Sequence, residues 1–202
     1  APTAAVAELT IGLMLSLLRS VHVSNLQMHQ GLWYRFLGKR LEEITVGIIG
    51  MGRIGSHVLR KLKGIGTSKI FANDISPNHE LDHEFNIEWV SKETIYKEAD
   101  IISLHIPLTY LTKNMIKKED LFSMKADANL INTSRGGIIS ENDLYEVMQT
   151  GHLGGAAIDV FDREPYDGPL KEVERCLLTA HMGSMSVDCR ARMEIESTEE
   201  AV

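Results

Sequence analysis

Three glycines at fixed spacing are the residues of this chain with the clearest chemical use. Gly50, Gly52 and Gly55 form a G-x-G-x-x-G pattern inside the segment V-G-I-I-G-M-G-R-I-G-S. Between a strand and a helix, such glycines allow a tight turn, a close approach of backbone to phosphate, and close packing of the helix on the strand. A helix expected from about Arg53 to Leu62 would direct its free N–H groups at an anion. The pattern predicts a site for the pyrophosphate of a dinucleotide.

An acid at the end of the next expected strand indicates which dinucleotide binds. Asp74 closes the segment K-I-F-A-N-D and stands 19 residues after Gly55, near the spacing of about 20 residues used by dinucleotide-binding folds. A carboxylate there accepts hydrogen bonds from the adenosine ribose hydroxyls and repels a 2′-phosphate, so we expect NAD rather than NADP. Glycines at such a corner also serve as simple turn formers, but the apolar strand and the spaced acid favour a cofactor site.

Further polar residues follow three later strands, at the edge of a parallel sheet where ligands bind. Arg135 can hold a carboxylate through two parallel N–H bonds. His181 can exchange a proton near neutral pH, and a carboxylate such as Glu164 beside it would stabilise its charged form. Asp159 could accept a hydrogen bond from a nicotinamide carboxamide. Taken singly, each could be a turn residue, an ion-pair partner or a loop histidine; together they fit hydride transfer between NAD and a 2-hydroxy or 2-oxo acid.

The elements expected around these residues are those of a doubly wound α/β fold. Apolar strands alternate with helices, which is typical of a parallel sheet covered on both faces. We expect residues 1–202 to form a single NAD(P)-binding Rossmann domain. After the glycine unit, strands are expected at 87–90, 101–106, 128–133, 156–160 and 177–180, and helices at 92–98 behind a Ser91 cap, 118–122, 140–149 ending at Gly151, and from about 185.

The N-terminal segment is expected to be a helix over residues 3–20 that is apolar nearly all round, which means burial on several sides. One small domain does not need that much apolar surface on a surface helix, so we expect residues 1–40 to form a helical dimerisation segment. The most apolar run, residues 4–18, is interrupted by polar residues, is short for a membrane span, and carries no cationic region or cleavage site. We therefore expect neither a membrane anchor nor a signal peptide.

Composition excludes several classes of protein. The chain of 202 residues has 21 basic and 28 acidic residues and a net charge of −7, which argues against a nucleic-acid-binding surface. Cys176 and Cys189 are not part of a C-x-x-C pattern, so neither a disulfide framework nor a zinc knuckle is indicated, and a reducing cytoplasm fits best. The length allows one good core. Because the chain begins with Ala-Pro rather than Met, we interpret it as part of a longer protein.

Six segments, in order along the chain, make a resemblance specific. They are V-A-E-L-T, G-I-I-G-M-G-R-I-G, S-L-H-I-P-L-T, L-I-N-T-S-R-G-G, G-A-A-I-D-V-F-D-R-E-P and T-A-H-M-G-S. With them the chain resembles the NAD-binding domain of the D-isomer-specific 2-hydroxyacid dehydrogenases, closest to the phosphoglycerate dehydrogenase branch. The resemblance runs over nearly the whole chain.

This resemblance implies roles for particular residues. Arg135 would anchor the substrate, Glu164 would partner the histidine, and His181 would donate and accept the proton. The NAD site would include Gly50, Gly52, Arg53, Ile54, Gly55, Asp74, Ile106, Thr133, Ser134, Asp159, Gly183 and Ser184, several of them through backbone atoms. The N-terminal helices would form a homodimer interface. The family's second, substrate-binding domain is absent from this chain, so we expect the chain to bind NAD and to turn over a small 2-hydroxy or 2-oxo acid poorly or not at all.

A competing pattern lies in the connector after the second strand. His79, Glu80 and His83 match H-E-x-x-H, the pattern of zinc metalloproteases. That mechanism needs both histidines on one face of a long helix, with the glutamate activating a metal-bound water. Here no sustained apolar helix surrounds the pattern and no H-x-x-G-x-x-H extension follows. We therefore expect no metal site.

Two alternatives share the expected fold. Corepressors of the C-terminal-binding-protein type carry the same Arg–Glu–His set and use NAD to control assembly, but nothing in this chain resembles their partner-binding extensions. Formate dehydrogenase is built on the same scaffold but has glutamine where Glu164 stands. The acid therefore favours hydroxy-acid chemistry.

Overall fold

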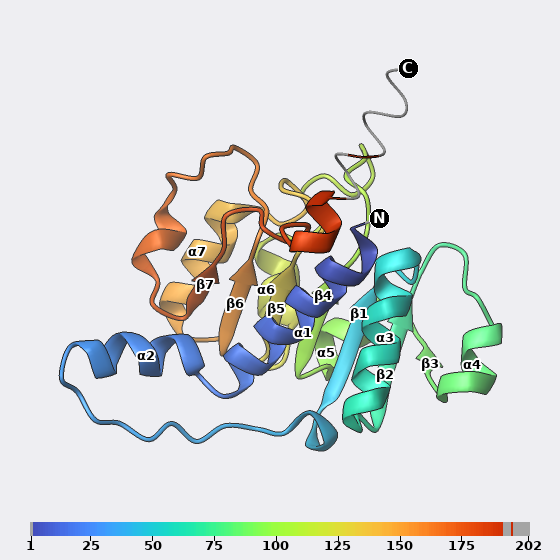
Figure 1. The fold of residues 1–202 in the computed structure, drawn as a ribbon, viewed down its shortest axis with the longest axis horizontal. Coiled ribbons are helices and arrows are strands. Elements are labelled where there is room, and N and C mark those ends of the chain that lie inside the picture. Colours follow the sequence, from blue (N-terminus) through green and yellow to red (C-terminus); the bar gives the residue numbers. More distant parts are fainter. Residues whose placement is uncertain (1, 192–194, 196–202) are drawn as a thin grey trace.

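One seven-stranded parallel sheet forms the centre of the molecule (Figure 1). The computed structural model describes residues 2–191 and 195. The strand order is β3-β2-β1-β4-β5-β6-β7, so the chain first moves outward from β1 and then crosses back to β4. This confirms the predicted doubly wound sheet. The strands are β1 Thr45–Ile49, β2 Lys69–Asn73, β3 Glu88–Trp89, β4 Ile101–Leu104, β5 Asn129–Asn132, β6 Gly155–Ile158 and β7 Cys176–Leu178.

Helices cover both faces of this sheet. α1 and α3 pack on one face, and α5, α6 and α7 pack on the other (Figure 1). Each face has its own apolar layer, with Leu59 in one and Leu144 in the other, both fully buried. The helices are α1 Thr3–Leu18, α2 Val21–His29, α3 Arg53–Ile65, α4 Glu80–Phe85, α5 Lys92–Glu98, α6 Lys118–Ser123 and α7 Glu141–Thr150, with 3-10 turns at Leu41–Glu43 and Pro169–Glu172.

Local sequence accounts for several element ends. The Ser91 hydroxyl accepts a hydrogen bond from the Thr94 amide and begins α5, as predicted. Gly151 ends α7 with a φ of 77°, a left-handed conformation that glycine adopts without steric cost. Ser140 precedes α7 as expected, but its side chain makes no cap hydrogen bond. Residues 187–191 are helical, while most of the helix expected from 185 lies outside the described residues.

The strands after the glycine unit are shorter than the apolar runs predicted. β4 stops at Leu104 and β5 at Asn132, although apolar or neutral residues continue. The chain leaves the sheet there because the following residues make turns at its carboxyl edge, where side chains and neighbouring loops satisfy their backbone groups. α2 and the short α4 were not predicted as separate helices.

α1 is buried on several sides, as its apolar sequence predicted. Its partners, however, are α3, β5 and β6 of the same chain, and Ala7 and Met14 are fully buried without a second subunit. The apolar character of α1 therefore does not by itself require dimerisation. In the N-terminal segment, Leu15 of α1 is exposed, and more of the exposed large apolar side chains lie on α2 and the residues after it, namely Val21, Leu26, Met28, Leu32, Trp33, Tyr34 and Leu37.

Among the described residues, no single helix is long and apolar enough to cross a membrane. Only α1 and α2 taken together reach that length and composition, with a bend of 64° between them.

Candidate active site

The glycine turn between β1 and α3 forms a cradle of bare backbone. Gly50 has a φ of 96°, which favours glycine. A Cβ on Gly55 would lie 2.0 Å from the Gly50 carbonyl oxygen, so the helix can approach the strand this closely only without a side chain. A Cβ on Gly52, in contrast, would meet no atom within 4 Å. The space over Gly52 is open, and the first-turn amides of α3 face it without a capping side chain.

Asp74 follows β2 and is tied to this cradle. Its Oδ2 accepts a hydrogen bond of 2.6 Å from the Met51 amide, and its Oδ1 accepts one of 2.9 Å from the Ser76 amide. The carboxylate therefore holds the glycine turn against the end of β2. It remains half-buried, so part of it still faces solvent beside the turn.

A cavity of about 360 Å³ extends from the cradle to the loops after β4 and β5. A volume of this size falls in the range of small-molecule sites. The predicted cofactor residues Arg53, Ile54, Ile106 and Ser134 line this cavity together with the predicted catalytic Arg135.

 The residues that line the cavity of about 360 Å³ are Pro2, Thr3, Arg53, Ile54, His105, Ile106, Pro107, Ser134 and Arg135.

The cradle and this cavity fit the group that the glycine pattern implies. A dinucleotide needs backbone that phosphate can approach, a helix N-terminus for the pyrophosphate charge, and a cleft for the rest of the molecule. The open space over Gly52 supplies the first, the start of α3 the second, and the cavity the third.

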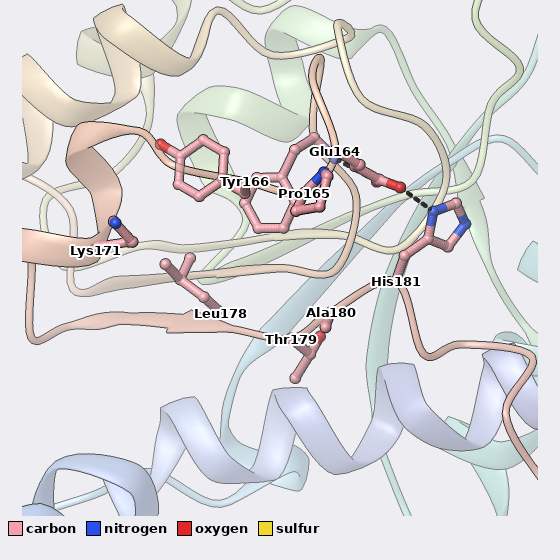
Figure 2. A pocket seen from close by; sticks show the side chains of 9 residues that line it. Glu164, Pro165, Tyr166, Lys171, Leu178, Thr179, Ala180 and His181 are labelled. Carbon is pink, nitrogen blue, oxygen red and sulfur yellow. Dashed lines mark hydrogen bonds and ion pairs between the residues drawn. The ribbon is translucent and has the colours of Figure 1, made fainter.

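His181 and Glu164 form a hydrogen-bonded pair at the same edge of the sheet (Figure 2). His181 Nδ1 lies 2.8 Å from Glu164 Oε2, and Glu164 Oε1 accepts a hydrogen bond of 3.0 Å from the Phe161 amide. The hydrogen bond from His181, supported by the Phe161 amide, lowers the pKa of Glu164 although partial burial opposes it. An ionised carboxylate only accepts hydrogen bonds, so Nδ1 is the donor and Nε2 is left for another partner.

A second cavity, of about 600 Å³, adjoins this pair (Figure 2). The Phe161 and Tyr166 rings stack with centroids 4.1 Å apart and form part of its apolar wall. Lys171 lies at the end away from His181 (Figure 2). The residues that line this cavity are Phe161, Glu164, Pro165, Tyr166, Lys171, Leu178, Thr179, Ala180 and His181.

Asp159 holds the turn that carries His181. The carboxylate is 1% exposed and accepts hydrogen bonds from the Thr179 hydroxyl at 2.6 Å, the Met182 amide at 2.8 Å and the Gly183 amide at 2.9 Å. His181 itself has a φ of 49°, a conformation that few non-glycine residues adopt. Both carboxylate oxygens thus position the turn, a role that differs from the nicotinamide contact expected from the sequence.

Arg135 lies on the loop after β5, residues 133–137, which we call the Arg135 loop. Its guanidinium is exposed, and one of its five N–H donors makes a hydrogen bond of 2.6 Å to the Ser134 carbonyl. The remaining donors suit a carboxylate held in two-point contact. Arg135 and the His181–Glu164 pair come from neighbouring strands of one sheet edge, as predicted.

Asn132 is a site residue that sequence reasoning missed. Its Oδ1 accepts hydrogen bonds from the Ser134 amide at 3.1 Å and the Ser134 hydroxyl at 2.8 Å, and its Nδ2 donates one of 2.9 Å to the Arg135 carbonyl. The side chain is 1% exposed and therefore fixes the Arg135 loop from inside. The available signal was an amide side chain at the end of a buried apolar strand.

The other predicted cofactor residues lie deeper at this edge. Thr133 is buried, and its hydroxyl lies 2.9 Å from the Thr10 hydroxyl of α1. Gly183 is packed between Val6 and Asp159, where a Cβ would meet both at 3.2 Å. Ser184 follows it in the same turn and is half-buried. α1 therefore packs against two loops of the site, through Thr10 and Val6.

The Arg135 loop and the loop after β6 touch through their backbones. We call residues 161–165 the Glu164 loop. A Cβ on Gly136 would lie 1.9 Å from the Phe161 carbonyl oxygen and 2.6 Å from the Asp162 amide nitrogen. Only glycine permits this approach, which brings the loop that carries Arg135 against the loop that carries Glu164.

The H-E-x-x-H segment lies apart from these groups. α4 has only 6 residues and begins after His79, so it is not the long helix that the zinc mechanism needs. His79 Nδ1 lies 2.8 Å from Asp82 Oδ2, which gives this histidine a local partner. Among the described side chains, no group of three or more His, Cys, Asp or Glu residues could hold a metal ion.

Comparison with known proteins agrees with this geometry. The family described as "D-isomer specific 2-hydroxyacid dehydrogenase, NAD binding domain" matches residues 11–183. D-3-phosphoglycerate dehydrogenase of Synechocystis sp. is 36% identical over 201 residues, which cover 98% of this chain and 36% of that protein. Glyoxylate reductase of Korarchaeum cryptofilum is 36% identical over 199 residues, which cover 95% of this chain and 60% of that protein.

A solved structure gives the same result in three dimensions. D-lactate dehydrogenase from Aquifex aeolicus, complexed with NAD and lactic acid, superposes with a TM-score of 0.90 at 27% identity. The match covers 100% of this chain and 66% of that one. The chain thus spans from about a third to about two thirds of the length of these relatives.

The contact at Gly136 predicts a steric test. Gly136→Ala should lower the free energy of unfolding by about 1–3 kcal/mol, because the methyl group meets rigid backbone of the Glu164 loop. Gly64→Ala is the matched control: a Cβ there meets nothing within 4 Å, and alanine in the helix should stabilise by about 0.5–1 kcal/mol. Urea unfolding followed by circular dichroism measures both. Equal effects of the two substitutions would show that the loops do not touch at Gly136.

Proposed function

Since the chain belongs to the D-isomer specific 2-hydroxyacid dehydrogenase family, as its NAD-binding domain, we propose that it supplies the cofactor-binding and proton-transferring half of an NAD-dependent dehydrogenase for small 2-hydroxy acids. The observation that carries this proposal is the hydrogen bond of 2.8 Å between His181 and Glu164. The pair lies at the same sheet edge as the glycine cradle and Arg135. We infer that a substrate-selecting domain, in the part of the relatives that this chain does not cover, completes the site.

The proposed roles follow from the geometry. The cradle at Gly52 holds the pyrophosphate, and Asp74 accepts hydrogen bonds from the ribose beside it. When bound, NADH supplies the hydride for the carbonyl carbon of a 2-oxo acid. Arg135 anchors the carboxylate of this acid and orients its carbonyl group. His181 donates the proton to the carbonyl oxygen and takes it back in the reverse reaction.

Glu164 prepares His181 for this transfer. Because its pKa is lowered, Glu164 is ionised throughout the neutral range and accepts from Nδ1. This fixes the ring with Nε2 directed away from Glu164 (Figure 2), and the negative charge stabilises the imidazolium that must form. A neutral side chain at this position would keep the orientation without the charge.

We infer that the protein works in a reducing compartment, in agreement with the cytoplasm expected from its sequence. Cys176 is a buried thiol, and burial raises its pKa to about 12. A thiol held in its neutral form is a poor nucleophile. This supports a structural rather than a redox role for Cys176.

We also propose a homodimer through the N-terminal helical segment, residues 1–40. α2 and residues 30–40 run along the lower side of the molecule, away from the N-terminal end of α1 (Figure 1). Trp33 is 78% exposed and Leu37 is 101% exposed, which is unfavourable for large apolar side chains that gather on one segment. A second copy of this chain is the occupant that would bury them.

The proton-transfer role predicts a loss of turnover. In the intact protein that carries this chain, His181→Ala should lower kcat for reduction of a 2-oxo acid by about 10²- to 10⁴-fold, with NADH binding unchanged. Glu164→Gln should lower kcat less, because the amide keeps the ring orientation but not the charge. His152→Ala, at a histidine that contacts the Met124 carbonyl instead, is the control and should stay within about twofold. Wild-type kcat in His181→Ala would remove this residue from the mechanism.

The dimer predicts a change of mass in solution. The wild-type chain should elute as a dimer in size-exclusion chromatography with light scattering, and Trp33→Asp with Leu37→Asp should give a monomer of unchanged circular dichroism, because both side chains are exposed in the folded chain. Ile75→Asp, at a residue 105% exposed in another loop, should leave the dimer intact. A monomeric wild type at micromolar concentration would refute the proposal.

A further inference from the structure

Glu141 occupies a position between the two loops that carry the proposed catalytic residues. It is the first residue of α7 and stands four residues after Gly137, the last residue of the Arg135 loop. Its side chain reaches from the start of the helix toward the Glu164 loop. Its Oε1 accepts a hydrogen bond of 2.7 Å from the Asp162 amide in the Glu164 loop.

This contact is the start of a short chain of hydrogen bonds that ends at His181. Asp162 follows Phe161, whose amide donates to Glu164 Oε1 at 3.0 Å. Glu164 Oε2 then lies 2.8 Å from His181 Nδ1. A shift of the Asp162 backbone would therefore move the carboxylate that holds the histidine.

The same stretch of backbone is fixed from its other side by the Arg135 loop. The Phe161 carbonyl lies against Gly136, where a Cβ would be 1.9 Å away, and Asp162 Oδ1 lies 3.0 Å from a Cβ on Gly137. The Glu164 loop is thus held between Gly136 and Glu141. Both belong to the segment that begins at Arg135, so one segment sets the spacing of Arg135 and Glu164.

The surroundings of Glu141 disfavour its charged form, so this side chain differs from a surface acid in contact with water alone. Burial raises the pKa of Glu141, and the nearby Asp162 carboxylate raises it further, while the Asp162 amide opposes both. Burial raises the pKa of Tyr166, and the charge of Glu141 contributes to that rise. Burying part of a carboxyl group beside another acid costs free energy, and a hydrogen bond accepted by one of its oxygens offsets that cost.

Asp143, two residues later on the same helical turn, provides a comparison. Its carboxylate also accepts a hydrogen bond from a backbone amide, that of Lys118 at 3.1 Å. That contact joins α7 to α6, away from the Glu164 loop. The two acids therefore share the first turn of α7 and the kind of contact, and they differ in the loop or helix that the contact holds.

We propose that Glu141 is a positioning residue that fixes the Glu164 loop, and through it the His181–Glu164 pair, relative to Arg135. The inference rests on the proposed function, in which these three residues act on the substrate. In this role the Glu141 carboxyl group must provide an acceptor oxygen for the Asp162 amide. A negative charge on the group is not required.

The first test needs neither substrate nor turnover. In the chain labelled with carboxyl-¹³C glutamate, the Glu164 signal is assigned by its absence in Glu164→Gln and followed against pH. Glu141→Ala should move the titration of Glu164 upward, toward the ordinary range, because the hydrogen bonds that lower its pKa loosen with the loop. Glu141→Gln keeps the acceptor and should titrate as wild type, and so should Asp143→Ala. An unchanged Glu164 titration in Glu141→Ala would overturn the proposal, whatever the protein catalyses.

The second test is kinetic and uses the intact protein. Glu141→Ala should lower kcat by about 10- to 100-fold with little change in the KM for NADH, as expected when reacting groups are displaced by about an ångström. Glu141→Gln should restore kcat, and Asp143→Ala should keep it. Equal losses in Glu141→Ala and Asp143→Ala would mean that only helix stability matters and would overturn the proposal. Absence of turnover in the wild type would instead refute the proposed function and leave the titration result standing.

Discussion

Backbone contacts between loops at the carboxyl edge of the sheet are the constraint on which the site depends. The two closest approaches at the glycines of the described chain are those of Gly55 to the Gly50 carbonyl and of Gly136 to the Phe161 carbonyl, and neither leaves room for a side chain. The first contact closes the cradle at the start of α3. The second brings the Arg135 loop against the Glu164 loop. A methyl group at either position would separate parts that must meet, so both glycines are required by packing rather than by flexibility.

Acids and amides then hold these loops in place. Backbone amides that leave a sheet need acceptors when they are shielded from water, and here side chains provide them. Asp74 accepts from Met51, Asp159 from Met182 and Gly183, and Asn132 from Ser134. Each of these residues stands at or just after the end of a strand. The same arrangement that keeps the loops folded also sets the distance between the cofactor cradle and the His181–Glu164 pair.

Much of the fold and part of the site could be predicted from the sequence. Apolar runs between polar turns identify the strands, and Ser91 and Gly151 mark helix ends through local chemistry. The glycine pattern and the strand-end residues place the cradle, Arg135 and His181 at one edge, because parallel strands share the direction of their carboxyl ends. These inferences need only local geometry and the topology of a parallel sheet.

The remaining features depend on which loops contact each other. Contacts between residues far apart in the chain cannot be predicted from local sequence patterns. The hydrogen bonds from the Met182 and Gly183 amides to Asp159, which hold the turn that carries His181, were not expected. Asn132 and Glu141 were missed because their partners lie in loops whose path is set by packing. The apolar sequence of residues 3–20 led us to expect a subunit interface over residues 1–40, but packing of α1 on its own sheet already accounts for most of that apolar sequence. The dimer expected for residues 1–40 stays a prediction.

The most direct test of the account is calorimetric titration of NAD into this chain and into Gly52→Glu. A side chain fits at Gly52 without steric conflict, since a Cβ there meets nothing within 4 Å, so the variant should fold normally. Its carboxylate would fill the cradle and repel the pyrophosphate. We predict that the wild type and the control Gly64→Glu bind NAD alike and that Gly52→Glu does not bind. Equal binding by a folded Gly52→Glu would contradict the placement of the cofactor at the glycine turn.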